Sequence, residues 1–224
     1  MKENRPYMFL NRVYVNTFFL PTIVFINMAC LRAQQPQLRS IMGIQAEWKG
    51  MDLGLLNMNF FSSEGNWFQN NTRLTADFKS NNNFRFGMGY QYEYVELKDR
   101  IQHESRPMLF LHFLKRWNNW DLRNLGTMEF RFINGTLRNR FKNEMGFHFT
   151  RWNIAQPFIL TSTSINLDKI QYVGQKTTIA INFPIDNFNL ILFGFHEIFR
   201  IINKTWSTRC AVGVIGIYKL TRFD

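Results

Sequence analysis

The residues with the clearest chemical potential lie in one short run, His103-Glu104-Ser105. A histidine and a serine can act as general base and nucleophile when both side chains lie on the same side of the chain. Residues i and i+2 of a β-strand meet this condition. Hydrolysis would also require a group that orients the base and an oxyanion hole, and nothing near the run supplies either. We therefore expect no enzyme; the alternative hypothesis is a lipid hydrolase at the edge of a barrel lumen.

The histidines are too dispersed along the sequence to hold a metal ion together. His103, His112, His148 and His196 fall in different apolar segments, without a His-x-x-x-His, Cys-x-x-Cys or dense carboxylate motif. Metal sites in proteins usually show such ligand spacing. The sequence therefore predicts neither a metal site nor a cofactor.

Charged residues recur at alternate positions between residues 73 and 144. In strands this spacing places them on one face. Buried charges are costly unless they are paired and hydrogen-bonded, and the interior of a narrow barrel can be filled by such pairs. We predict a lumenal charged ladder made of Arg73, Asp77, Arg85, Glu93, Glu104, Arg106, Glu129, Arg131, Arg138, Arg140, Lys142 and Glu144.

The elements that must position these charges are long strands. Residues 84–94 alternate strictly between aromatic or apolar side chains and polar or small ones, and residues 128–132 and 141–149 repeat the pattern. The apolar rows form the opposite face of the same strands. We predict that this face meets lipid through Phe84, Phe86, Met88, Tyr90, Met128, Phe130, Phe132, Phe147 and Phe149.

Turn residues separate the alternating runs at intervals of roughly 12–20 residues, which indicates long strands joined by short turns. Clear examples are 80–83, 134–135 and 184–187. Helical periodicity is nearly absent after residue 40. We predict an all-β fold: a single antiparallel up-and-down β-barrel of about 10 strands (roughly 10–12), formed by residues 34–224.

A barrel with one apolar face can hide that face in two ways. A soluble, lipocalin-like barrel turns it inward around a ligand, whereas a transmembrane barrel turns it outward to lipid. Aromatic residues make up 17% of the chain, and most of its tryptophans lie beside predicted turns, where an aromatic girdle would sit. These features favour a transmembrane barrel of the outer-membrane type and leave the soluble ligand-binding barrel as an alternative.

The amino terminus reads as an export signal. Lys2, Arg5 and Arg12 precede an interrupted apolar stretch over 13–31, and polarity rises sharply after Ala33. The continuous apolar part is too short to span a bilayer comfortably. We therefore predict a signal peptide over residues 1–33, cleaved on export, and a location in the outer membrane of a Gram-negative bacterium.

The chain is basic, with 27 Lys and Arg against 16 Asp and Glu and a formal net charge of +11. The positive residues are scattered rather than gathered in a stripe or a recognition helix, which excludes the usual nucleic-acid-binding designs. Basic surfaces also attract anionic lipid headgroups. The expected partners are therefore outer-membrane lipids and lipopolysaccharide, not nucleic acid.

Five short motifs occur in an order that resembles the DUF2490 family, uncharacterised exported β-barrel-like proteins common in Bacteroidetes. The motifs are residues 84–92, 103–107 (His-Glu-Ser-Arg-Pro), 128–132, 138–141 and 193–196. The resemblance covers roughly residues 44–220. It implies an outer-membrane barrel, and the family has no established activity to transfer.

These observations predict an outer-membrane barrel with a structural or accessory role and a salt-bridged lumen, with membership of a larger envelope protein complex as one form of that role. The alternative from a different functional class is a channel or transporter for a small solute. Its arginine-rich lumen would then favour anions.

Overall fold

The structure is a computed structural model that describes residues 35–62, 66–97, 100–200 and 206–220. The predicted signal peptide, residues 1–33, lies outside the described residues, so its cleavage stays a prediction. Among the residues described, no helix is long and apolar enough to cross a membrane.

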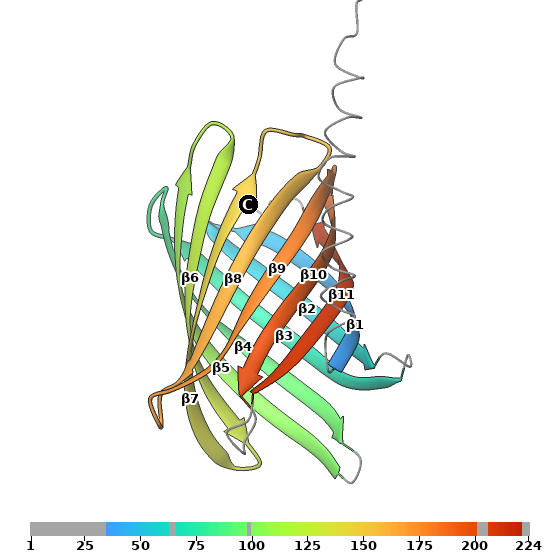
Figure 1. Ribbon diagram of the computed structural model, residues 1–224. Helices are drawn as coiled ribbons and strands as arrows, with labels where there is room; N and C mark the ends of the chain where they lie inside the picture. The colour runs from blue at the N-terminus through green and yellow to red at the C-terminus, as the bar shows by residue number, and fades with distance from the viewer. Residues whose placement is uncertain (1–34, 63–65, 98–99, 201–205, 221–224) are drawn as a thin grey trace, which may run out of the picture.

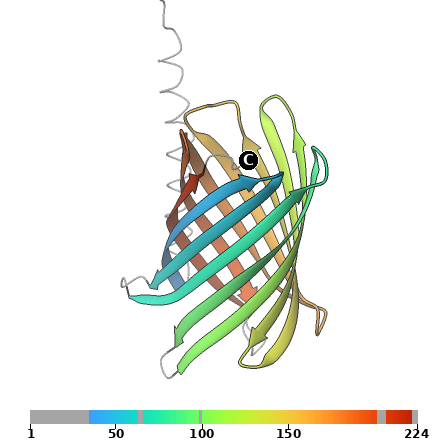
Figure 2. The ribbon, with the colours of Figure 1, turned by 180° about the vertical axis from the view of Figure 1, so that it is seen from behind.

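The described chain forms a closed barrel of strongly tilted strands, seen from two sides in Figures 1 and 2. The strands are β1 (Gln35–Trp48), β2 (Met51–Ser62), β3 (Trp67–Lys79), β4 (Phe84–Leu97), β5 (Arg100–Arg116), β6 (Trp120–Ile133), β7 (Thr136–Phe149), β8 (Gln156–Asn166), β9 (Gln171–Ile185), β10 (Phe188–Arg200) and β11 (Trp206–Lys219). The prediction of a β-barrel with 10–12 strands is confirmed.

Neighbouring strands in the sequence pair as antiparallel hairpins, but the barrel closes through a parallel pair, β1 with β11. The register of this seam runs from Gln35 opposite Arg209 to Gln45 opposite Lys219. The expectation of antiparallel pairing throughout is therefore wrong at the seam. An odd number of strands that alternate in direction must bring two parallel strands together when the sheet closes.

Tight turns define the two ends of the barrel. Lys49 and Gly50, with φ of 46° and 80°, join β1 to β2, and Asn134 and Gly135, with φ of 48° and 80°, join β6 to β7. Positive φ at both central residues is typical of the type I′ hairpin turn, which fits the right-handed twist of paired strands. We call the end that carries the turns after odd-numbered strands the Gly50 end, and the opposite one the Gly135 end.

Strand alternation separates the inner and outer faces of the wall. The outer face carries the large apolar side chains, and Phe86 is 55% exposed there. The inner face carries most of the charged residues together with some buried apolar ones, and Glu104 is 1% exposed there. Closure of the sheet keeps this division all the way round, since side-chain direction alternates along every strand.

The lumen has an apolar side and a charged side. Ala180, Phe193, Phe195 and Ala211 form a buried cluster on β9, β10 and β11, and partly buried residues of β1, β8, β10 and β11 pack against it. The charged side chains gather mainly on β3–β7. The interior therefore combines a small hydrophobic core with an ion-pair network.

Candidate functional site in the lumen

A buried arginine joins two carboxylates that would otherwise repel each other. Glu93 of β4 and Glu104 of β5 are directly opposite in register. Arg106, two residues further along β5, places Nη2 3.0 Å from Glu93 Oε2 and 2.7 Å from Glu104 Oε1. One guanidinium thus compensates two facing negative charges, as buried carboxylates require.

Two further arginines complete the network from β6 and β7. Arg131 donates to both oxygens of Glu104, at 2.5 and 2.8 Å. Arg140 donates from Nε to Oε2 of Glu129 at 2.7 Å. Bidentate arginine–carboxylate pairs are geometrically specific and among the stronger hydrogen-bonded contacts. This central network therefore ties β4, β5, β6 and β7 together through side chains as well as through the backbone.

Buried side chains occupy the middle of the lumen. Gln91, Met108 and Thr127 point inward at this level and are buried, as is Phe110. Gln91 accepts two hydrogen bonds from Arg73, at 2.9 and 2.7 Å. Tightly packed interiors leave few voids larger than a water molecule, and these side chains lie packed next to the central network.

A polar cavity of about 550 Å³ opens toward the Gly50 end. Asp52 is paired there with Arg85 and lies 3.6 Å from Lys79 Nζ. His112 Nε2 lies 3.3 Å from Asp77 Oδ1. The charged side chains of this cavity are mixed in sign.

A second cavity, of about 500 Å³, lies at the Gly135 end, and the charged side chains of its lining are mostly positive. The charged residues of its lining are Arg131, Arg138, Arg140, Asp168, Lys169 and Arg200. Its sign contrasts with the mixed charges of the Gly50-end cavity.

The structure places the twelve ladder residues on the inner face but divides them into groups. Arg73, Glu93, Glu104, Arg106, Glu129, Arg131 and Arg140 belong to the central network. Lys142 and Glu144 pair with each other at 2.9 Å. Asp77 and Arg85 line the Gly50-end cavity, whereas Arg138 lies at the Gly135-end mouth. The ladder is therefore not one continuous row.

Sequence reasoning missed the charged residues on the far side of the lumen. Arg209 donates to Glu197 at 3.0 and 2.5 Å. Arg39 lies between two aromatic rings, 4.4 Å from the centroid of Phe60 and 4.3 Å from that of Phe195. Their positions follow the same two-residue alternation as their strands, and that signal could have found them. Charges are sparse in β1, β10 and β11, so the alternation there is a weak signal.

The run His103-Glu104-Ser105 splits between the two faces. Glu104 points into the lumen, whereas His103 and Ser105 lie on the outer wall. His103 Nδ1 lies 2.6 Å from the Tyr92 hydroxyl, and the Ser105 hydroxyl lies 2.9 Å from that of Tyr90. Each therefore hydrogen-bonds a tyrosine of β4 on the outer wall, on the face opposite the lumen.

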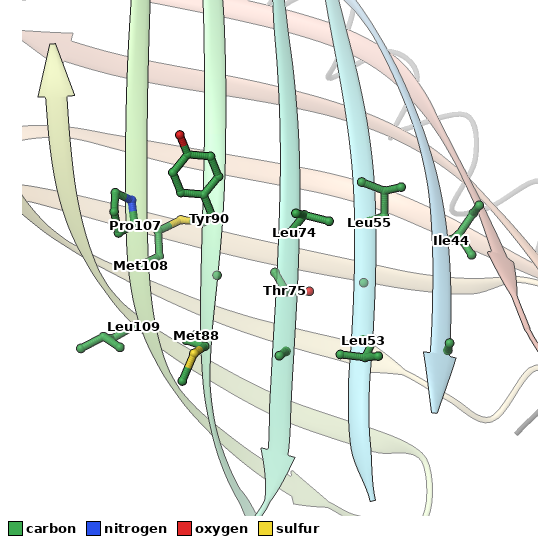
Figure 3. Close-up of a pocket in the computed structure, with 14 residues that line it drawn as sticks. Ile44, Leu53, Leu55, Leu74, Thr75, Met88, Tyr90, Pro107, Met108 and Leu109 are labelled. Carbon is green, nitrogen blue, oxygen red and sulfur yellow. The ribbon is translucent and has the colours of Figure 1, made fainter. Parts of the chain in front are cut away.

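All nine residues predicted to meet lipid lie on the outer face, spread over β4, β6 and β7. Beside them, β1–β5 enclose an apolar hollow of about 700 Å³ in the wall. Figure 3 shows Ile44, Leu55, Leu74 and Tyr90 around it, one from each of four adjacent strands. The outer wall in this region is thus a continuous apolar surface with a depression in it.

The outer wall also carries a polar ladder toward the Gly135 end, which sequence reasoning did not anticipate. Asn70 donates to Asn59 at 2.8 Å and to Asn57 at 3.2 Å, and Asn57 donates to Thr72 at 3.1 Å. The tyrosine pairs with His103 and Ser105 continue it onto β4 and β5. Uncharged polar groups that satisfy one another are tolerated where water is scarce.

Aromatic side chains gather near both ends of the wall. At the Gly50 end, Trp120 packs edge-on against Phe149 with ring centroids 4.8 Å apart, and Trp152 contacts the same phenylalanine. At the Gly135 end, Trp206 lies against Tyr172 at 5.7 Å. Trp and Tyr with partly exposed rings are characteristic of membrane–water interfaces.

In comparisons with known proteins, no family model, no curated protein and no solved structure matches the chain. Within the ranges described, no three His, Cys, Asp or Glu side chains are grouped so that they could hold a metal ion.

Proposed function

We propose that this chain is an exported outer-membrane β-barrel with a closed lumen and a structural or accessory role in the envelope of a Gram-negative bacterium. The observation that carries the proposal is the distribution of side chains across one wall: large apolar residues outside, paired charges inside. Membership of the DUF2490 family is part of this proposal and rests on the motif order alone.

The exposed apolar surface supports a lipid environment. Phe86, Met88, Leu109 and Leu111 are each more than half exposed on adjacent strands. Soluble monomers rarely leave contiguous apolar patches larger than a few hundred Å² in water. A lipocalin-like barrel would have these rows inside, where this wall carries Arg106, Glu104 and their partners.

The filled lumen supports a structural role over transport. Conduction needs a continuous polar path, whereas the described mid-level is occupied by Gln91, Met108, Phe110 and Thr127. Outer-membrane lipids and lipopolysaccharide are the partners that the outer wall would meet. The proposed role extends to membership of an envelope complex, for which the polar ladder of the wall offers hydrogen-bonding groups.

Membrane assembly can be tested with one charge placed at two depths. Phe86→Arg should prevent assembly, because arginine at a bilayer midplane costs about 2–4 kcal/mol on a barrel's lipid face. Ile170→Arg is the matched control, since Ile170 lies in the β8–β9 connection and is 87% exposed. The measurement is the amount of heat-modifiable barrel in outer-membrane fractions. Processed, folded protein recovered from detergent-free periplasmic extract would refute the proposal.

A small-solute channel is the second candidate, and the cavities at both ends of the lumen favour it. Planar-bilayer recordings separate the two functions. The closed barrel should show no unitary current, and Met108→Ala combined with Phe110→Ala should create one by emptying the mid-level. Leu109→Ala, on the outer face between them, is the control. A reproducible open state of the unmodified protein would establish the channel instead.

A further inference from the structure

The Gly135-end cavity has more positive side chains than the ion-pair network neutralises. Arg131 and Arg140 of its lining are engaged by Glu104 and Glu129. No carboxylate of the described chain forms an ion pair with Arg138, Lys169 or Arg200, which line the same cavity. Like charges grouped around a low-dielectric wall repel one another, so this arrangement favours a bound anion.

The strand register gathers these cations. Arg131 of β6 and Arg138 of β7 are directly opposite each other beside the Asn134–Gly135 turn. Arg131 is turned toward Glu104, and Arg138 lies at the mouth of the cavity. Lys169 comes from the β8–β9 connection and Arg200 from the end of β10. Four separate elements thus deliver positive side chains to one opening.

The acid of the lining is already engaged with the backbone. Asp168 accepts from the amide nitrogen of Asn139 with both carboxylate oxygens, at 3.2 and 3.0 Å. When the Gln171 amide is assigned with its oxygen toward Arg200, that oxygen accepts from the guanidinium at 2.8 and 3.2 Å. Polar groups therefore shape the mouth without neutralising it.

We propose that the Gly135-end mouth, formed by Arg138, Lys169 and Arg200, is a binding site for a phosphate monoester. A cavity of about 500 Å³ is within the size range of ligand pockets. Arginine donates to phosphate oxygens in a bidentate manner, and lysine adds a compact charge. Three cations match a doubly charged phosphate better than a singly charged carboxylate. The site does not depend on where the barrel resides in the cell.

The test uses the full-length purified barrel in an uncharged detergent. Calorimetric titration with glycerol phosphate measures a soluble phosphate monoester, and native mass spectrometry with phosphatidic acid measures a lipid headgroup. Binding of the soluble probe assigns the site to free phosphate esters, and binding of the lipid alone assigns it to a headgroup. If neither probe binds, the proposal is wrong.

Matched charge variants separate a built site from general attraction. Arg138→Gln, Lys169→Gln and Arg200→Gln together should weaken binding by about tenfold or more, because charge-assisted hydrogen bonds are lost. Lys115→Gln, Arg116→Gln and Arg151→Gln remove the same charge from exposed positions at the Gly50 end and should change affinity less than about twofold, as expected for screened distant charges. Equal weakening by both sets would overturn the proposal. Should the triple variant fail to fold, Lys169→Gln alone must still weaken binding more than Lys115→Gln does.

Discussion

Arg131 holds both carboxylate oxygens of Glu104 across the β5–β6 pair, with Nε and Nη2 at 2.5 and 2.8 Å. Glu104 also receives Arg106, which lies on its own strand. Two arginines therefore depend on one buried carboxylate. Removing one partner of such a pair leaves the other charged and buried, which is strongly destabilising. The pair therefore disfavours structures that separate its members, even where its net contribution to the free energy of folding is small.

Glu104→Gln should destabilise the barrel by about 3–5 kcal/mol, the usual cost of breaking a buried ion pair on one side. The measurement is urea-induced unfolding of the detergent-refolded protein, followed by tryptophan fluorescence. Glu96→Gln is the control, since Glu96 is exposed, and should stay within about 0.5 kcal/mol. Glu104→Leu combined with Arg131→Met should cost less than Glu104→Gln, and a larger loss would contradict this account.

Gly213→Ala should weaken the parallel seam. A Cβ at Gly213 would overlap the backbone oxygen of Arg39 in β1 and lie 2.6 Å from Cζ of Phe193. Overpacking of this kind costs about 1–3 kcal/mol. At Gly126, a Cβ would have Phe141 as its nearest neighbour at 3.6 Å, so Gly126→Ala should leave the stability of the barrel unchanged. The lower midpoint of thermal unfolding in the Gly213 variant is the readout; equal midpoints would argue against close packing at the seam.

The polar ladder should mark the depth at which the hydrocarbon ends. Leu109 and Ser105 lie on the outer side of β5, four residues apart. Leu109→Arg should block membrane assembly at a cost of about 2–4 kcal/mol, whereas Ser105→Arg should cost about 0–1 kcal/mol, as near an interface. Folding yield into lipid vesicles compares the two. Equal yields would show that the ladder does not lie at the interface.

Serine-directed chemistry should find no nucleophile in the run 103–105. The Ser105 hydroxyl is paired with Tyr90, and His103 Nδ1 with Tyr92. Hydrolysis would instead require a hydrogen bond from the Ser105 hydroxyl to the His103 imidazole. A fluorophosphonate probe should leave Ser105 unlabelled, and Ser105→Ala should not change lipid hydrolysis. Labelling at Ser105 that disappears in His103→Ala would restore the hydrolase hypothesis.

Alternation in the sequence was informative about the faces of the strands because its period of two is a local property. In 84–94 every second residue is aromatic or apolar, and Phe86 and Met88 lie outside as that pattern indicates. The alternation does not predict which residues pair across neighbouring strands. Which arginine meets Glu104 depends on the register of β5 against β6, and local periodicity leaves that register undetermined.

The seam and the polar ladder escaped prediction for related reasons. The parallel pairing of β1 with β11 follows from the number of strands around the whole barrel, which no single segment encodes. Asn57, Asn59 and Asn70 read as polar interruptions of two strands, and only their alignment across β2 and β3 turns them into a hydrogen-bonded group. This group, too, depends on the register between two strands.

The parallel seam between β1 and β11 has a mechanical consequence. In a barrel with an even number of alternating strands, the first strand starts where the last one finishes. Here β1 starts at the Gly135 end and β11 finishes at the Gly50 end. Anything tethered ahead of β1 and anything tethered beyond β11 would therefore project from opposite mouths.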